Sequence, residues 1–411
     1  MKLQLDSLNK FISGVKALSG NAPIYGILLE ILDNNVKLIY TDGKKALYNK
    51  VDAVVSEEEA KLGGVVLEYN TLADGLQKTQ ANGNLKVNQV DFDFSSLHEE
   101  RVKASAIKYM IFEDGDKQVE TQVSEIEFYI KAYTSDTTVN KYKHLVQFDY
   151  DTQIFGNDVA DTWNVSDFTN LIQRLSKGDD GKSANISSKR NVGFIVNRNS
   201  LFYISSKADI NQGFIITKFM CKAMLDIISK FEPSTLKLSV TDALYCSIYT
   251  EDFGVWFEMM KFREIDGKML GEYERVTGTD SVRAYNDIEI LLNREATLDM
   301  VKASQVGKRL DSVDTEILSI DYDNSELIFG DEKSGMSKLG VQLRHKDSTN
   351  KSKLGVVYKV WEDILSNCTG VYVRLGIELK DEKTVYMRFA DLDTENNSVN
   401  AYMYTISTER T

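Results

Sequence analysis

The chain has 411 residues, of which 42% are hydrophobic and 27% are charged, and it carries a formal net charge of -13. This length is too great for one ordinary hydrophobic core and suits two to four domains of about 100 to 200 residues each. No apolar run approaches the roughly 20 residues that a membrane helix needs, and the first residues lack the apolar core of a signal peptide, so we expect a cytoplasmic protein.

Strand-like runs dominate the chain, and only two prolines interrupt it. Most of these runs are rich in β-branched and aromatic residues, and many alternate apolar with polar side chains. Pairs such as Asp-Gly and Asn-Gly mark the turns between them. The predicted strands, in chain order, are Gly26–Leu32, Val36–Tyr40, Leu85–Phe94, Ile126–Ala132, Gly193–Val196, Leu201–Ser205, Leu236–Val240, Ala243–Thr250, Gly254–Met260, Ile317–Tyr322, Glu326–Phe329, Val371–Leu375, Thr384–Phe389 and Val399–Ile406.

Six further segments carry apolar residues at helical spacing. In the first of them Leu8, Phe11 and Val15 share one face, and in the third Ser166 is the expected N-cap. The predicted helices are Ser7–Ser19, Asn70–Gln80, Ser166–Lys177, Thr217–Phe231, Leu291–Arg309 and Val356–Asn367.

The order of these elements predicts the fold class. Two helices fall in each third of the chain, and each is followed by two to four strands, so a unit of strand, helix and several strands recurs about six times. Strands do not alternate singly with helices, which disfavours a doubly wound parallel sheet and predicts an α+β protein with helices segregated from antiparallel sheets.

Polar stretches at Glu113–Glu125 and Thr277–Val282 suit breaks between the thirds of the chain. They predict three domains, at residues 1–122, 123–279 and 280–411. The segment Thr134–Trp163 fits no repeat, and we interpret it as an elaboration of the middle domain.

Positive charge is concentrated in the predicted helices. Counting Lys and Arg against Asp and Glu, with Glu232 included at the end of the fourth helix, gives the six helices together a net charge of +5, whereas the whole chain carries -13. If the helices share one side of the sheets, that side is a positive surface suited to sequence-independent phosphate contact. The alternative is that these helices carry lysines only for solubility.

Cysteine and histidine are too few and too scattered to predict a chemical site. The three cysteines, Cys221, Cys246 and Cys368, have no paired spacing, so we expect buried reduced thiols rather than disulfides or a zinc site. Neither a nucleophile-elbow motif nor a zinc-protease motif occurs. The sequence therefore predicts no catalytic residue, no metal and no cofactor.

Two segments resemble ligand-binding loops but depart from them where it matters. Gly178–Ser183 lacks the first glycine of a phosphate-binding loop, and its two aspartates would repel phosphate, so we interpret it as a connecting loop. Asp321–Glu332 has acidic residues at calcium-loop spacing, but Glu326 stands where the turn needs glycine. We predict instead a hairpin that turns at Asp323 and Asn324.

Four stretches resemble the bacterial sliding clamp, the beta subunit of replicative DNA polymerase. The first is the opening strand and helix to Ser19, and the second is Asn21–Glu30 (NAPIYGILLE) with the run Val36–Asp42. The third is Ile265–Val276 (IDGKMLGEYERV), which is similar to the segment that joins the second and third domains of that family, and the last is Ala401–Ile406 (AYMYTI). The joining segment departs from the family at Leu270-Gly271, where a proline is usual.

This resemblance implies a DNA-clamp fold of three similar domains, each with two helices lining a central channel and antiparallel sheets outside. Two subunits would meet head to tail, the first domain of one against the third domain of the other, as a homodimer ring. The implied function is that of a non-enzymatic processivity factor that encircles duplex DNA and tethers the polymerase. Partners would be duplex DNA, the DNA polymerase and a clamp loader, and the low proline content and divergence suggest a viral, phage-type replisome in a host cytoplasm.

The clamp interpretation assigns two sets of residues. Side chains expected to line the channel and contact DNA are Lys10, Lys16, Lys78, Arg174, Lys177, Lys218, Lys222, Arg294, Lys302, Lys308 and Lys359. Residues expected to form a pocket for partner peptides between the second and third domains are Ser205, Lys207, Gly271, Val276, Met403 and Thr405. The competing interpretation is a β-rich structural or assembly protein that does not bind DNA.

Overall fold

The structure, a computed structural model, describes residues 1–79, 85–114, 117–155, 160–177, 183–187, 192–196, 200–205, 210–241, 244–259, 287–305, 316–331, 335–345, 353–379, 384–393 and 398–409. The chain forms two compact units. The first unit contains Met1–Ser166 and Lys222–Lys261, and the second contains Asp167–Cys221 and Phe262–Thr411. Among the described residues, each unit holds one sheet of 13 strands.

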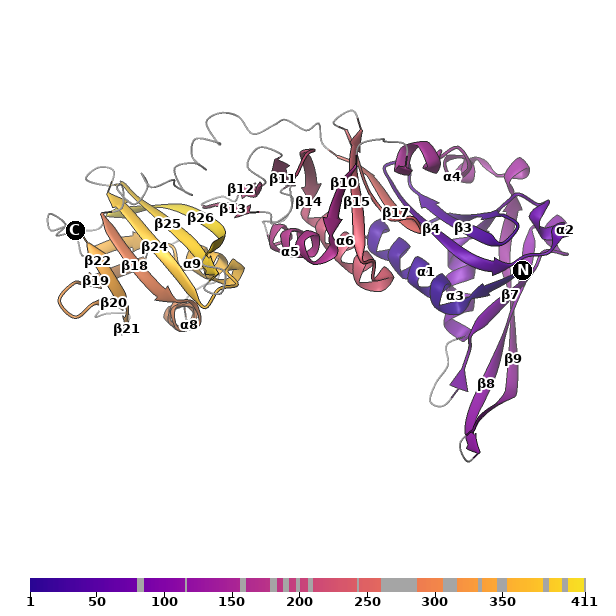
Figure 1. Cartoon of the computed structure of the whole chain (residues 1–411), viewed down its shortest axis with the longest axis horizontal. Helices are drawn as coiled ribbons and strands as arrows, with labels where there is room; N and C mark the ends of the chain where they lie inside the picture. The colour runs from indigo at the N-terminus through magenta and orange to yellow at the C-terminus, as the bar shows by residue number, and fades with distance from the viewer. Residues whose placement is uncertain are drawn as a thin grey trace. The chain divides into compact units, whose positions relative to one another are not determined.

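One order of elements occurs three times along the chain: strand, helix, four strands, helix, three strands, with one extra strand, β22 (Gln342–His345), between the two helices of the third repeat (Figure 1). The first repeat also contains the short elements α2 (Glu57–Ala60), β6 (Leu85–Lys86), η1 (Leu97–Glu99) and η2 (Ser135–Thr137). Its regular elements are β1 (Lys2–Gln4), α1 (Leu5–Ser19), β2 (Gly26–Ile31), β3 (Asn35–Thr41), β4 (Lys45–Val54), β5 (Gly64–Glu68), α3 (Tyr69–Thr79), β7 (Gln89–Asp93), β8 (Arg101–Asp114) and β9 (Lys117–Thr134).

The second and third repeats follow the same order. The second comprises β10 (Asp161–Asn164), α5 (Val165–Leu175), β11 (Ser183–Ser187), β12 (Val192–Val196), β13 (Ser200–Ser205), β14 (Phe214–Thr217), α6 (Lys218–Phe231), β15 (Thr235–Thr241), β16 (Tyr245–Tyr249) and β17 (Phe253–Glu258). The third comprises β18 (Ile288–Asn293), α8 (Arg294–Ser304), β19 (Glu316–Asp321), β20 (Glu326–Asp331), β21 (Gly335–Gly340), β22 (Gln342–His345), β23 (Lys353–Val356), α9 (Tyr358–Asn367), β24 (Tyr372–Leu379), β25 (Thr384–Asp393) and β26 (Ser398–Glu409).

The predicted fold class is confirmed, because every strand pairing among the described residues is antiparallel and all six predicted helices are present. The domain limits stay a prediction, although residue 122, where we placed the first break, lies within β9. The segment predicted as a hairpin is one, since β19 and β20 pair around Asp323 and Asn324.

Three helix starts differ from the prediction. Helix α5 is capped by Asn164, whose Oδ1 accepts hydrogen bonds from the Ser166 backbone N–H at 2.8 Å and hydroxyl at 2.7 Å, so Ser166 is not the cap. Helix α8 begins at Arg294 rather than Leu291, because the preceding residues pair with β24. In the same way, Val356 ends β23, and α9 begins at Tyr358. Apolar side chains at a strand end look like the first turn of the following helix.

Two strand pairings join neighbouring repeats. At the first junction, β4 pairs with β17 from Lys45–Phe257 to Asn49–Phe253. At the second junction, β13 pairs with β26 from Ser200–Thr405 to Ile204–Ala401. Each sheet therefore runs without a break from one repeat into the next.

Helices cover one face of the first junction. Helix α1 packs on β4 through Leu8, Phe11 and Val15, which are buried. It also contacts α6 at Gly14, where an added Cβ would lie 2.9 Å from Leu47 Cδ2 and 3.5 Å from Phe231 Cε2. Figure 1 shows α1 and α6 on this face of the strands and α4 on the opposite face.

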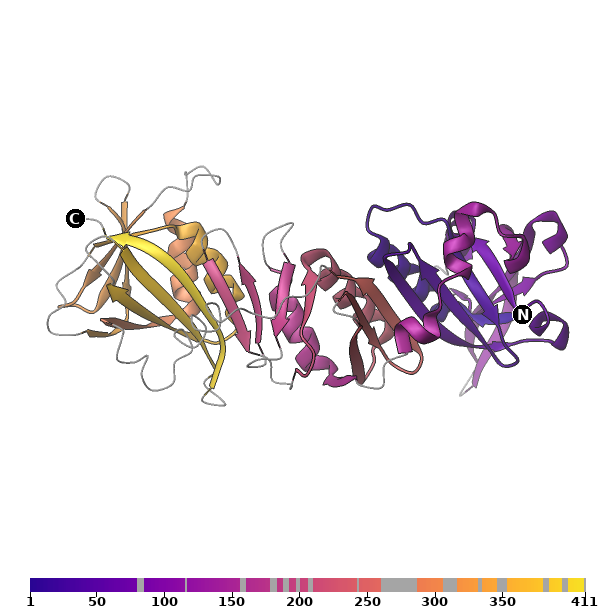
Figure 2. The same cartoon turned by 90° about the horizontal axis from the view of Figure 1, so that it is seen from above.

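The opposite face of the first junction is covered by residues 139–155, which we call the strap. The strap consists of η3 (Asn140–Tyr142), α4 (Lys143–Val146) and the π-helix η4 (Asp151–Phe155). Figure 2, the view from above, has this segment in front of the strands of the first repeat. Its Tyr142, Leu145, Tyr150 and Ile154 side chains are buried against strands of both the first and the second repeat. We interpreted Thr134–Trp163 as an elaboration of the middle domain; its residues 139–155 also pack on strands of the first repeat.

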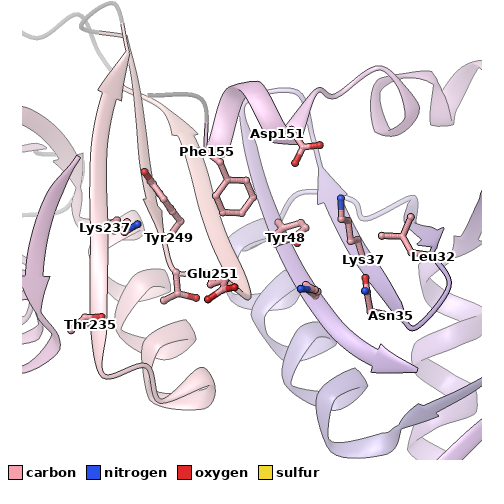
Figure 3. Close-up of a pocket in the computed structure, with 12 residues that line it drawn as sticks. Leu32, Asn35, Lys37, Tyr48, Asp151, Phe155, Thr235, Lys237, Tyr249 and Glu251 are labelled. Atoms are coloured by element: carbon pink, nitrogen blue, oxygen red, sulfur yellow. The ribbon is translucent and has the colours of Figure 1, made fainter. Parts of the chain in front are cut away.

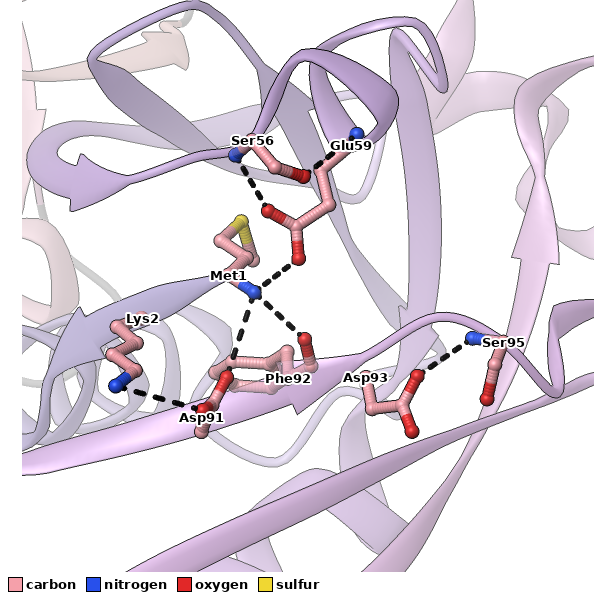
Figure 4. Close-up of polar contacts among 8 residues, drawn as sticks. All are labelled: Met1, Lys2, Ser56, Glu59, Asp91, Phe92, Asp93 and Ser95. Atoms are coloured by element: carbon pink, nitrogen blue, oxygen red, sulfur yellow. Dashed lines mark hydrogen bonds and ion pairs between the residues drawn. The ribbon is translucent and has the colours of Figure 1, made fainter.

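A polar cluster fixes β1 and α2 to the first sheet (Figure 4). The Met1 amino group donates to the Phe92 carbonyl at 2.9 Å and to the Glu59 carboxylate. Glu59 also accepts from the Ser56 backbone N–H at 2.8 Å, which completes a capping box at the start of α2. Burial of this carboxyl raises its pKa, but the hydrogen bonds from Met1 and Ser56 outweigh that effect and leave the pKa of Glu59 lowered.

Candidate nucleic-acid interface

The described helices are less basic than the predicted ones. With their observed limits, α1, α3, α5, α6, α8 and α9 together carry a net charge of +2 rather than +5. The net charge falls because α1 includes Asp6, because α5 ends before Lys177, and because Lys308 and Arg309 lie outside the described residues. It rises by one because α6 ends before Glu232. A net charge of +2 over six helices does not by itself define a basic surface, so the position of each cation decides whether it can contact DNA.

Four of the predicted DNA contacts are open to solvent. These lysines lie on α1, α3, α6 and α8, on the sides of the helices that do not pack on the sheets, and none has an ion-pair partner among the described residues. They are Lys16, Lys78, Lys222 and Lys302. Long flexible cations of this kind suit phosphate contact that does not depend on base sequence.

Three more predicted contacts, on α1, α6 and α9, are less available. Lys10 pairs with Asp6 at 3.0 Å. Lys359 pairs with Glu362 at 3.1 Å and with Asp363 at 3.4 Å; burial lowers its pKa, but these carboxylates outweigh burial and raise it. Lys218, at the start of α6, is half-buried.

The remaining described cations converge on the end of α9 at the second junction. Arg174 donates to the Thr369 hydroxyl and lies 3.5 Å from the Asp391 carboxylate. Lys177 donates to the Ser366 carbonyl at 2.9 Å, and Arg294 donates to the Cys368 carbonyl at 2.8 Å. Lys177 and Arg294 thus satisfy carbonyls that the end of α9 leaves without intrahelical partners, and Arg174 binds side-chain oxygens beside them.

Asp391 is the centre of this cluster. Its carboxylate is fully buried and accepts hydrogen bonds from the Thr369 backbone N–H at 3.0 Å, the Thr369 hydroxyl at 3.1 Å and the Gly370 N–H at 2.8 Å. Burial of the Lys177 ammonium group and the charge of Arg174 beside it lower the pKa of Lys177, although the residue as a whole is exposed. Arg174 and Lys177 therefore join the end of α5 in the second repeat to the end of α9 in the third, and Arg294 joins α8 to the same end of α9 within the third repeat. Their sequence positions gave no sign of this, because they come from separate elements.

The predicted partner pocket is only partly within the described residues. Ser205 ends β13, and Met403 and Thr405 lie in β26, where they pair with Phe202 and Ser200. The structure thus brings these two segments together. Lys207, Gly271 and Val276, with the rest of Ile265–Val276, lie outside the described residues, as do 178–182 of the predicted connecting loop.

Within the described residues, no group of three His, Cys, Asp or Glu side chains could hold a metal ion. No helix in that part of the chain is long and apolar enough to span a membrane. The three cysteines are buried, and none is joined in a disulfide within the described residues.

The strap is the feature that sequence analysis missed. Strands β2 and β17 are near-continuous apolar runs, which is typical of strands buried on both faces. With α1 and α6 on one face, a cover on the other face was needed. The aromatic run Phe148–Phe155 was the signal that could have identified it.

Comparison with known proteins places the chain by its fold. No family model and no curated protein matches the sequence. Solved structures match over the whole chain. One is the DNA polymerase III beta subunit of Thermotoga maritima, with 12% sequence identity and a TM-score of 0.65. Another is the DNA polymerase III subunit beta of Pseudomonas aeruginosa, with 13% identity and a TM-score of 0.67; each match covers 100% of this chain and 99% of the other. The DNA polymerase sliding clamp of Bacillus subtilis also matches (13%, 0.66), with 100% of this chain and 98% of the other covered. The resemblance seen in the sequence is therefore confirmed, and this chain has the fold of the bacterial DNA polymerase III beta sliding clamp along its full length.

Proposed function

We propose that this protein is a DNA sliding clamp, which closes as a ring around duplex DNA and tethers a replicative DNA polymerase as a processivity factor. It has no enzymatic activity of its own in this proposal, acts in the cytoplasm, and is placed on DNA by a clamp loader. The observation that carries the proposal is the match of all three repeats, in order and over the whole chain, to solved sliding clamps.

Two sheet edges support closure into a ring. Strand β21 corresponds to β4 and β13, which form the two junctions, but its second edge has no strand partner among the described residues. Strand β9 corresponds to β17 and β26, and β5 covers its second edge only from Ala132 to Thr134. We propose that β21 of one copy pairs with β9 of the next, head to tail, in a homodimer.

The registers of the two junctions predict the register of this third pairing. We match the strands of the three repeats one by one and apply the junction registers to β21 and β9. Ser337 then lies opposite Ile126, and both are half-buried. Lys338 lies opposite Glu125, and both are exposed. Side chains that face inward thus oppose each other, and a cation opposes a carboxylate. An opposite-charge pair of this kind stabilises antiparallel strands by about 0.2 to 1 kcal/mol.

The charge distribution supports sliding rather than tight binding. A ring is retained on DNA by its closure, so weak phosphate contacts are sufficient, and the four exposed lysines Lys16, Lys78, Lys222 and Lys302 could supply them. The acidic remainder of the chain would repel DNA from other surfaces. The partner peptide would bind beside β13 and β26, at the pocket predicted from Ser205, Lys207, Gly271, Val276, Met403 and Thr405.

The decisive test is topological and needs no clamp loader. The protein is mixed with linear duplex DNA that is tethered at one end to a bead, and the free end is then either blocked with streptavidin or left open. A clamp should remain on the blocked DNA through a high-salt wash and leave the open DNA. Equal salt-sensitive loss from both DNAs would contradict the proposal and favour a β-rich assembly protein.

The ring contact has its own test. Lys338→Glu sets like charges opposite each other and should weaken the dimer several-fold in analytical ultracentrifugation, with loss of retention on blocked DNA. The matched variant Lys338→Glu with Glu125→Lys restores opposite charges and should recover most of the dimer. Failure of this reversal would mean that β21 and β9 do not pair in this register.

A further inference from the structure

The face of the first junction under the strap is an apolar groove with two recesses backed by glycine. Gly254 in β17 pairs with Tyr48 on one side and Tyr249 on the other. An added Cβ there would lie 2.5 Å from Cγ2 of Ile154, so this side chain enters the space that the glycine leaves. At the other end of the strap, an added Cβ on Gly26 would lie 2.8 Å from the ring of Tyr142. The strap therefore inserts one anchor at each end of the groove.

Aromatic packing holds the strap between these two anchors. The rings of Tyr150 and Tyr48 stack with centroids 5.3 Å apart. Phe155 meets Tyr48 edge-on at 5.2 Å and Tyr249 at 5.3 Å. Stacked and edge-on ring pairs of this kind stabilise the strap beyond the burial of its apolar area.

Few polar contacts hold the strap, and none belongs to a strand ladder. No described residue of 139–155 lies in a β-strand. Its polar contacts with the strands are the Tyr150 hydroxyl, which donates to Glu30 and accepts from Lys37 at 2.5 Å, and the Gln153 backbone carbonyl, which accepts from the Ser247 hydroxyl at 2.9 Å. Side-chain anchors in a preformed groove are the mode by which proteins bind short peptides.

One end of the groove remains open (Figure 3). A cavity of about 800 Å³ lies beside Phe155, with Tyr48 and Tyr249 in its wall. Three lysines line it, Lys37, Lys50 and Lys237, together with Asp151 of the strap and Glu251. The strap itself alternates aromatic residues with carboxylates from Phe148 to Asp151, which matches a site of aromatic rings and lysines.

We propose that the first junction is a peptide-binding groove which this chain fills with its own strap, and that the strap is an exchangeable occupant rather than a fixed part of the core. A peptide of the same chemistry, in which aromatic side chains alternate with carboxylates, binds there when the strap lifts, and the lysine-lined cavity is its entry point. This groove is separate from the pocket predicted at the second junction, and it does not depend on the clamp proposal.

The first test supplies the strap as a separate peptide. A fluorescein-labelled peptide of residues 139–155 is titrated with the wild-type protein and with Tyr142→Ala/Ile154→Ala, which removes both anchors from the chain but not from the peptide. A strap closed for about 99% of the time weakens the apparent affinity of a competitor about 100-fold. The variant should therefore bind the peptide tens of times more tightly than wild type.

Two controls define that result. Val139→Ala/Val146→Ala alters two exposed strap residues and should behave as wild type. A peptide with Ala in place of Tyr150 and Phe155 should not bind either protein. Equal binding of the intact peptide by wild type and the anchor variant, or binding by neither while the variant remains folded, overturns the proposal.

A second measurement uses the unaltered protein and applies even if the anchor variant does not fold. Amide hydrogen exchange followed by mass spectrometry should give strap amides that exchange at least tenfold faster than those of β4 and β17, through an opening that leaves the sheet intact. Exchange of strap and strands together, in one global event, would mean that the strap is core structure, and the proposal would be wrong.

Discussion

The two junctions between repeats use the same strand pairing but are stabilised differently. At the first, β4 and β17 are covered on one face by α1 and α6 and on the other by the strap, and the contacts are apolar or aromatic. At the second, Arg174, Lys177 and Arg294 converge on Asp391 and the end of α9. The first junction is therefore stabilised by apolar area removed from water, and the second by hydrogen bonds and ion pairs to a buried carboxylate.

This difference predicts different tolerance to change. Apolar packing loses stability in proportion to the volume added or removed and is little affected by salt. A buried carboxylate with several donors is costly to remove, because each donor loses its partner in a place that water does not reach. The four predictions below, from the largest effect to the smallest, test this contrast.

Asp391→Ala should have the largest effect, because it leaves Arg174 and the N–H groups of Thr369 and Gly370 without their acceptor. We expect a loss of about 2 to 4 kcal/mol in the free energy of unfolding, measured in urea. Asp363→Ala, on the exposed side of α9, is the control and should stay within about 0.5 kcal/mol of wild type. Similar values for both variants would mean that the cluster does not stabilise the second junction.

Gly254→Ala should be the most damaging small change at the first junction. The new methyl group would meet Ile154 and also lie 3.1 Å from Tyr249 Cβ, so we expect a loss of about 1 to 3 kcal/mol from overpacking. In a double-mutant cycle, Gly254→Ala should cost less free energy of unfolding in an Ile154→Ala background than in the wild type. Gly340→Ala is the matched control, because no atom lies within 4 Å of its added Cβ. An equal loss of stability there would mean that the change of glycine to alanine in a strand, and not the clash with the strap, lowers the free energy of unfolding.

Glu59→Gln tests a charged cluster of the first unit that lies away from both junctions. The pKa of Glu59 is lowered in the folded protein, so its ionised form stabilises the fold at pH values above the unfolded pKa, about 4.3, and this contribution is lost as the pH falls through the folded value. The free energy of unfolding of the wild type should exceed that of the variant by less than about 1 kcal/mol near pH 7, because the carboxyl is partly exposed. This difference should disappear below pH 4. Glu57→Gln, in the same helix and exposed, is the matched control; an equal change in both variants would mean that the contacts of Glu59 with Met1 and Ser56 do not cause the effect.

Replacing Lys16, Lys78, Lys222 and Lys302 with Ala should change stability least, by no more than about 0.5 kcal/mol each, because the four side chains are exposed. It should shorten the residence of the protein on blocked DNA, and each lost phosphate contact should reduce the slope of binding against salt by about one unit. An equal number of exposed lysines outside the helices forms the control set: Lys44, Lys61, Lys131 and Lys353. If both sets weaken retention equally, the helices do not face DNA.

Most of the repeat pattern could be predicted from sequence, because it depends on neighbours a few residues apart. The 3.6-residue spacing of Leu8, Phe11 and Val15 identified α1, and turn residues such as Asp323-Asn324 located the β19–β20 hairpin. Helix limits were less certain. Leu291 and Val356 are apolar at helical spacing but belong to strands, because pairing partners far away in the sequence determined their conformation.

The candidate DNA surface was predictable only as a set of cations. Spacing placed Lys16, Lys222 and Arg174 alike on helices, yet the first two are open to solvent, whereas Arg174 contacts Thr369 and Asp391, about 200 residues further along the chain. No local pattern carries that information. The availability of a charge depends on which other groups the fold brings within hydrogen-bonding distance.

The sequence by itself determined that this protein is built from three similar repeats of antiparallel strands with two helices each, because hydrophobic periodicity and turn chemistry act locally. Only the tertiary structure decided that the strap covers the first junction and that several donors surround Asp391 at the second. It also decided that, among the described residues, one edge of β21 has no strand partner and one edge of β9 has a partner only from Ala132 to Thr134. The physical reason is common to all three. Burial and pairing are properties of groups distant in the chain, and they exist only once the sheets have assembled.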